Sequence, residues 1–148
     1  MITKIVPTIS SGTAGSLGIL HLPRLWQKCI LFTKGLLPED YGCCSPGYDM
    51  MVLDCLGISK DDVQAFFKDK SPSYSAFEAW ILEKKEGNID QASIKKLNEA
   101  ILGYHHKDEV RTSILDSACM KDDGKFKDAV NLNNFDDWAA FHALVVKG

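Results

Sequence analysis

Three side chains that can carry positive charge occupy regular positions near residue 21. His21, Arg24 and Lys28 are spaced at i, i+3 and i+7, which places them on one face of a helix. They follow a segment that contains Gly15 and Gly18. A helix N-terminus presents free N–H groups and a partial positive charge, which suits an anion. We therefore predict that this region binds the phosphate or carboxylate of a small ligand. The alternative is that the glycines make a close backbone contact while the cations form a solvated face.

A second group surrounds the adjacent cysteines Cys43 and Cys44, which precede Tyr48 and Asp49. A nucleophilic thiolate needs a lowered pKa, which a helix N-terminus or a nearby histidine provides. Cys44 lies just before a predicted helix, and His21 could approach it in space. The alternative is a pair of ordinary loop thiols with Asp49 in a first helical turn. Two adjacent cysteines supply only two of the four ligands of a structural zinc, so we predict no metal site here.

Other candidates are weaker. His105 and His106 are adjacent in a predicted loop and could bind a metal, but no acidic or cysteine partner lies at ligand spacing. The segment 122–124 (DDG) lacks the alternating acids and the closing Glu of a calcium loop. We therefore predict no cofactor. His142 lies among apolar residues, which favours a hydrogen-bonded packing role.

The elements that must position these groups are helices. Apolar residues recur at helical spacing in about seven short segments, and no convincing strand is present, so an all-α array is predicted. The first helix is expected to start at Leu22, with Pro23 in its first turn, and to stop at Gly35. Residues 1–20 are expected to form an extended Gly/Ser-rich arm that packs on this body, within one domain spanning 1–148.

The last helix is predicted to begin at a cap formed by Asn133 or Asn134. Asp136 and Asp137 would then lie in its first turn, where the helix dipole favours acids. The large apolar side chains of this helix are expected to pack inward: Phe135, Trp138, Phe141 and Val145. Trp26 and Trp80 also lie on apolar stripes, and large aromatics in such positions usually belong to the core.

Composition narrows the function classes. The 148 residues include 17 basic and 20 acidic side chains, a net charge of −3 that argues against a general nucleic-acid binder. No apolar run is long enough for a membrane helix, and the N-terminus lacks the apolar core of a signal peptide. The five cysteines are odd in number, which favours reduced thiols and a cytoplasmic location.

Several stretches carry a family resemblance. They are segments 9–15 (ISSGTAG), 17–28 (LGILHLPRLWQK), 47–57 (GYDMMVLDCLG) and 77–81 (FEAWI). Together they resemble a group of small bacterial proteins catalogued as a domain of unknown function, DUF 5069. The resemblance covers nearly the whole chain and is densest over residues 10–81. It implies a helical fold, but no reaction and no catalytic residues.

The favoured interpretation is a non-enzymatic binding or accessory module for a small anionic molecule or a protein partner. The predicted ligand-binding residues are His21, Arg24, Lys28, Gly15, Gly18, Tyr48 and Asp49. The first alternative is an enzyme that uses His21, Arg24 and Asp49, with Cys44 as an optional member. It requires at least two titratable groups within hydrogen-bond reach inside a cleft. The second alternative is a structural homodimer, which requires a large exposed apolar patch.

Overall fold

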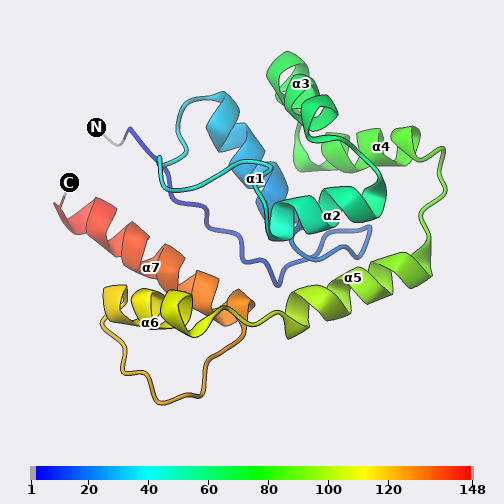
Figure 1. Cartoon of the computed structure of the whole chain (residues 1–148). Coiled ribbons are helices and arrows are strands. Elements are labelled where there is room, and N and C mark those ends of the chain that lie inside the picture. Colours follow the sequence, from blue (N-terminus) through cyan, green and yellow to red (C-terminus); the bar gives the residue numbers. More distant parts are fainter. Residues whose placement is uncertain (1–2, 148) are drawn as a thin grey trace.

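The computed structural model describes residues 3–147, so Met1, Ile2 and Gly148 of the predicted domain lie outside the described residues. The structure has seven α-helices in this range and no sheet, and their arrangement can be followed in Figure 1. Their bounds are α1 Leu22–Thr33, α2 Tyr48–Leu56, α3 Lys60–Lys70, α4 Tyr74–Lys84, α5 Gln91–Gly103, α6 Asp108–Ser117 and α7 Ala129–Lys147. The predicted all-α fold is confirmed. None of the described helices is long and apolar enough to cross a membrane.

Helix α1 lies at the centre of the larger hydrophobic core. It contacts α2, α3 and α4, while α2 packs on α5. Its apolar face contributes Leu22 and Leu25, both fully buried, and α3 and α4 contribute Phe67 and Phe77. The two phenylalanine rings meet edge to face with centroids 4.9 Å apart, a favourable aromatic geometry. This core fixes α1 and therefore the three side chains predicted to bind a ligand.

Local sequence signals set most helix boundaries. Pro23 lies in the first turn of α1, and Gly35 follows its end with φ +70°, a conformation that glycine adopts at little cost. Ser59, Ser73 and Asp90 each accept a hydrogen bond from a backbone N–H in the first turn of α3, α4 and α5. The predicted start and stop of α1 and the predicted caps at Ser59 and Asp90 are confirmed.

Helix α7 begins earlier than predicted. It starts at Ala129, because the Asp128 carboxylate accepts a hydrogen bond from the Asn131 N–H at 2.9 Å. The prediction of a cap at Asn133 or Asn134 is therefore wrong. As a consequence, residues 136 and 137 lie in the second and third turns of the helix rather than in its first turn.

The outer face of α7 is exposed, so the prediction that Trp138, Phe141 and Val145 pack inward is wrong. These three residues are 62%, 55% and 54% exposed. The same prediction is confirmed for Phe135, which α7 buries together with Leu132 in a small second cluster with α6. Helix α7 packs mainly on α6 and α5, so the apolar side chains on its opposite face remain in contact with solvent. Trp26 and Trp80 are half-buried at the edge of the main core.

Residues 3–20 hold no helix and run alongside α1, on the side that faces α7 (Figure 1). The Gln27 side-chain oxygen accepts hydrogen bonds from the N–H groups of Thr8 and Ile9 at 2.8 and 3.0 Å. The Ile9 carbonyl in turn accepts a bond from Arg24 at 2.9 Å. These bonds attach the N-terminal segment to α1 and help to position Arg24.

Candidate functional site

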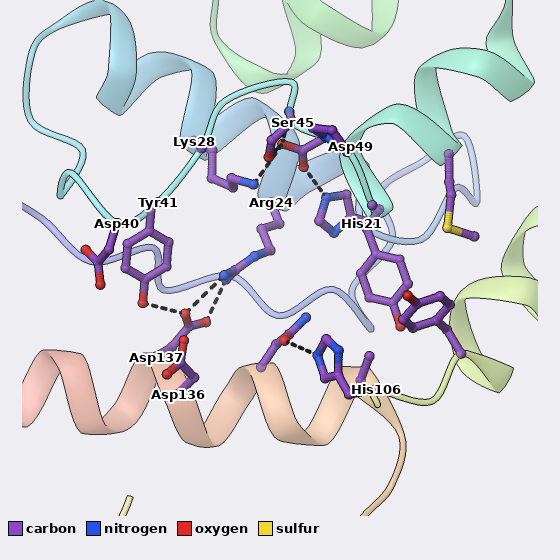
Figure 2. Close-up of a pocket in the computed structure, with 18 residues that line it drawn as sticks. His21, Arg24, Lys28, Asp40, Tyr41, Ser45, Asp49, His106, Asp136 and Asp137 are labelled. Atoms are coloured by element: carbon purple, nitrogen blue, oxygen red, sulfur yellow. Dashed lines mark hydrogen bonds and ion pairs between the residues drawn. The ribbon is translucent and has the colours of Figure 1, made fainter. Parts of the chain in front are cut away.

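The site residues line a cavity of about 350 Å³ between α1, the start of α2 and the first turns of α7 (Figure 2). The loop before α2 closes one side. The polar and charged side chains that line it are His21, Arg24, Lys28, Asp40, Tyr41, Ser45, Tyr48, Asp49, Tyr104, His106, Asn133, Asp136 and Asp137. This density of ionisable groups distinguishes the cavity from the other, more apolar hollows of the molecule.

Asp49 is the centre of one buried network. Its Oδ1 lies 2.6 Å from His21 Nε2, and its Oδ2 accepts a hydrogen bond from Lys28 Nζ at 2.8 Å. The same Oδ2 accepts a bond from the Ser45 N–H at 3.2 Å. On the other side of the imidazole ring, Ser11 Oγ lies 2.9 Å from His21 Nδ1. The start of α2 is thereby joined to two turns of α1 through one carboxylate.

A second network joins α1 to α7. The Arg24 guanidinium donates two hydrogen bonds to the two carboxylate oxygens of Asp137, at 2.6 and 3.0 Å. This fork geometry matches a carboxylate and is the strongest form of such a pair. Tyr41 donates a further bond to Asp137 Oδ1 at 2.8 Å. Arg24 and Asp137 are 113 positions apart in the chain.

Burial and charge set the protonation of the first network. Burial alone would raise the pKa of Asp49, but the hydrogen bond from His21 and the charge of Lys28 outweigh it and lower the pKa to about 2. Burial lowers the pKa of His21, and it outweighs the opposing effect of Asp49. At neutral pH the imidazole is therefore neutral. It donates its Nε2–H to the Asp49 carboxylate and accepts a bond from Ser11 at Nδ1.

The order Ser11–His21–Asp49 has the connectivity of a hydrolase triad, but its geometry excludes that chemistry. Ser11 is 1% exposed and does not line the cavity, so no substrate carbonyl can reach its Oγ. Both ring nitrogens of His21 are already occupied within the protein. The three residues instead hold the imidazole ring in one orientation.

Aromatic rings form one wall of the cavity. The ring centroids of His21 and Tyr48 are 5.4 Å apart, those of Tyr48 and Tyr104 are 5.8 Å apart, and those of Tyr104 and His106 are 6.0 Å apart. Tyr48 is fixed by a hydrogen bond from its hydroxyl to the Ile101 carbonyl at 2.7 Å. The row therefore connects α1 and α2 to the loop after α5.

The structure brings five of the seven predicted ligand-binding residues to this cavity: His21, Arg24, Lys28, Tyr48 and Asp49. The alternative that the three basic residues form a solvated face is wrong, because the exposure of each is 8% or less. Gly15 and Gly18 do not line the cavity. A side chain at position 15 would collide with the Tyr74 ring, so Gly15 makes the close contact that the alternative expected, whereas Gly18 adopts φ +72° in open space.

Cys44 does not belong to this cavity. It is 1% exposed and its sulfur lies beside those of Cys29 and Cys43 instead. The two loop histidines have different environments. His105 is exposed, whereas His106 lines the cavity and its Nε2 lies 2.9 Å from Asn133 Oδ1. Within residues 3–147, no group of three or more metal-ligating side chains includes either histidine.

Sequence reasoning missed the site residues of α7, one in the loop before α2 and one at the end of α5. Asp136 and Asp137 were expected to complement the helix dipole, and Asp40 and Tyr104 were not considered. The adjacent acids in a long helix were the available signal, because a buried arginine on α1 requires a buried carboxylate elsewhere. No spacing rule connects positions so distant in the chain.

No family model, curated protein or solved structure matches this chain. The resemblance to DUF 5069 therefore remains a prediction, and the function must be argued from the site itself.

Proposed function

We propose that the cavity binds a small organic cation, an amine or ammonium compound, and that the protein is a binding module rather than an enzyme. The observation that carries this proposal is an excess of acid beside a row of aromatic rings. Four aspartates line the cavity, whereas the lysine and arginine residues that line it are Arg24 and Lys28, so acids outnumber these bases by two. Aromatic faces attract cations, most strongly when water is excluded.

The charges also bear on the anionic ligand predicted from the sequence. Arg24 is neutralised by Asp137, and Lys28 is neutralised by Asp49. An anion would have to displace a buried carboxylate from one of these pairs. Asp40 and Asp136, by contrast, are exposed at the cavity and form no ion pair among the described residues. Partial desolvation within the cavity and the neighbouring charges of Asp137 and Asp40 raise the pKa of Asp136, so a bound cation would be favoured there.

The enzyme alternative receives less support from the geometry. It required two titratable groups within hydrogen-bond reach in a cleft, and His21 with Asp49 meets that condition. A general base must also have a free nitrogen that can reach the substrate proton. His21 has no such nitrogen and is 2% exposed. We propose a structural role for the His21–Asp49 pair. We also propose a cytoplasmic location, because the five cysteines are unpaired.

Isothermal titration calorimetry with matched compounds tests the proposal. Putrescine, butanediol and succinate share a four-carbon chain and differ in charge, and tetramethylammonium probes the aromatic wall. We expect putrescine or tetramethylammonium to bind and the other two not to bind. Asp136→Asn should weaken that binding about tenfold, which corresponds to about 1.4 kcal/mol. Asp116→Asn, an exposed acid of α6 outside the cavity, is the matched control. Binding of succinate alone would overturn the cation proposal in favour of an anion site.

The homodimer remains a second candidate, because a row of apolar side chains is exposed along α7. Trp138, Phe141 and Val145 recur at i, i+3 and i+7, so they form one continuous strip. Patches of this kind on a soluble protein commonly mark an interface. We propose that a second copy of the chain covers this strip.

Light scattering coupled to gel filtration tests this candidate. We expect a dimer at high micromolar concentration, and we expect Phe141→Glu to convert it to a monomer, because a charge in an apolar interface is desolvated without a partner. The matched control is Leu102→Glu, since Leu102 is 56% exposed on α5 and lies outside the strip. A wild-type protein that stays monomeric at these concentrations would contradict the homodimer.

A further inference from the structure

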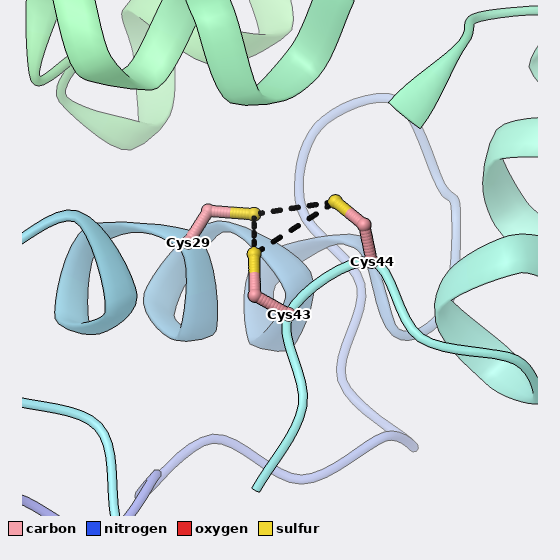
Figure 3. Close-up of side chains that lie close together, drawn as sticks. All are labelled: Cys29, Cys43 and Cys44. Carbon is pink, nitrogen blue, oxygen red and sulfur yellow. Dashed lines mark hydrogen bonds between the residues drawn. The ribbon is translucent and has the colours of Figure 1, made fainter. Parts of the chain in front are cut away.

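Three cysteine sulfurs converge on one point outside the acidic cavity. Cys29 comes from the middle of α1, and Cys43 and Cys44 come from the loop before α2 (Figure 3). Cys29 Sγ lies 3.1 Å from Cys43 Sγ and 3.9 Å from Cys44 Sγ, and the two loop sulfurs are 3.8 Å apart. All three cysteines are free thiols. The arrangement is therefore a triangle of sulfur atoms and not a disulfide.

The size of this triangle matches the face of a tetrahedral zinc site. With Zn–S bonds of about 2.3 Å and tetrahedral angles, two sulfur ligands of one ion are about 3.8 Å apart. Two of the three observed separations agree with this value, and the third must widen by roughly 0.7 Å. Cys43, which takes part in the short separation, is only partly buried and lies in a loop, where such a shift is inexpensive.

The backbone explains how two adjacent cysteines point to the same place. Successive side chains of an extended segment point to opposite sides. Cys44 adopts φ +55°, a left-handed conformation that turns the chain at this residue. The turn is held by the hydrogen bond from the Ser45 N–H to Asp49. Cys29 faces it because α1 is fixed in the main core.

We propose that Cys29, Cys43 and Cys44 bind one Zn²⁺ ion through three thiolates and leave a fourth position open. Thiolate sulfur is a preferred ligand for this ion. Within residues 3–147, no fourth histidine, cysteine or carboxylate belongs to the group. Cys29 and Cys43 also line a neighbouring cavity of about 300 Å³, together with Phe32, Gln64 and Lys68, and this cavity gives access to the site.

The surroundings determine what the fourth position can hold. Three thiolates and one Zn²⁺ ion leave a net charge of −1, which the positive charge of Lys68, a residue that lines the same cavity, partly offsets. Three protein ligands with one open position are the pattern of zinc sites that exchange a water or a small ligand. The site is thus expected to take water, or a single thiol or other small donor that enters through this cavity. It is independent of the amine site proposed above.

Metal binding to the full chain provides the test. Reduced protein is incubated without oxygen with one equivalent of Zn²⁺ and desalted, and zinc is then counted by elemental mass spectrometry. We expect one ion per chain, and competition with a chromophoric chelator should show at least about hundredfold weaker binding for Cys29→Ser. Cys55→Ser and Cys119→Ser remove the two cysteines outside the triangle and should retain the ion, which makes them matched controls.

A second readout distinguishes loss of a zinc ligand from a folding defect of the variant. Cys43→Ser alters a partly exposed loop position, so its circular dichroism should match that of the wild type while its zinc is lost. Co²⁺ in place of Zn²⁺ should give the intense visible bands of a tetrahedral site and a sulfur-to-cobalt band in the near ultraviolet. A wild-type chain that retains no ion would overturn the proposal, as would a folded Cys43→Ser variant that binds zinc as tightly as the wild type.

Discussion

Arg24→Ala is expected to lower the free energy of unfolding by about 3–5 kcal/mol, the usual cost of removing one partner of a buried ion pair. Among residues 3–147, the substitution leaves the Asp137 carboxylate, 7% exposed, with only the Tyr41 hydroxyl as a side-chain partner. It also removes the donor to the Ile9 carbonyl, so the N-terminal segment loses a tie to α1. Chemical denaturation monitored by tryptophan fluorescence measures the change, and the melting temperature should fall by roughly 10 °C.

Two further variants distinguish the effect of losing the buried Arg24–Asp137 ion pair from the effect of removing any charged side chain. Lys84→Ala removes a partner from the exposed pair between Lys84 and Asp62, whose atoms are 3.2 Å apart, and should cost less than about 1 kcal/mol. Arg24→Met combined with Asp137→Leu replaces both charges by apolar groups and should recover much of the stability lost in Arg24→Ala. An Arg24→Ala protein as stable as Lys84→Ala would show that the contact between α1 and α7 is not formed in solution.

Asp49→Asn is expected to lower the free energy of unfolding by a similar amount, about 3 kcal/mol or more, with almost no change in side-chain shape. Lys28, which is 8% exposed, would keep its charge without a counterion, and His21 would lose its charged acceptor. Lys28→Met added to Asp49→Asn removes the uncompensated charge and should restore part of the loss. If the double variant were no more stable than Asp49→Asn, the pairing of Lys28 with Asp49 would contribute nothing.

The pH dependence provides an independent readout of Asp49. Because its pKa falls from 3.8 to about 2 on folding, the unfolded chain binds more protons between these values. The contribution of Asp49 is fully present above pH 4, and about 2 kcal/mol of it is lost as the pH falls toward 2. The stability difference between wild type and Asp49→Asn should therefore narrow from pH 5 to pH 3. A difference that stays constant over this range would contradict the low pKa.

Local sequence signals were sufficient for most of the helices. The first turn of α1 at Pro23 and the caps at Ser59 and Asp90 depend on residues within one turn of each boundary. The start of α7 was predicted wrongly because local signals do not choose among several possible caps. Asp128, Asn133 and Asn134 can all cap a helix. The choice among them depends on how far the helix can extend while Leu132 still packs on α6.

The candidate site was also predictable only in part from the sequence. Helical periodicity alone placed His21, Arg24 and Lys28 on one face, but it could not tell a solvated face from a buried one. The carboxylates that neutralise this face, Asp49 and Asp137, come from two other helices. Because these carboxylates pair with the basic side chains, we propose a cationic ligand in place of the anionic ligand predicted from the sequence.

By itself, the sequence determined the helices and the face on which the basic residues lie, because these follow from contacts within a few residues of each other. Only the tertiary structure decided that Asp137 neutralises Arg24 and that Cys29 joins the two loop cysteines. These contacts join residues that are 113, 14 and 15 positions apart. Their formation depends on how whole helices and loops pack together, and helical periodicity carries no information about which elements meet.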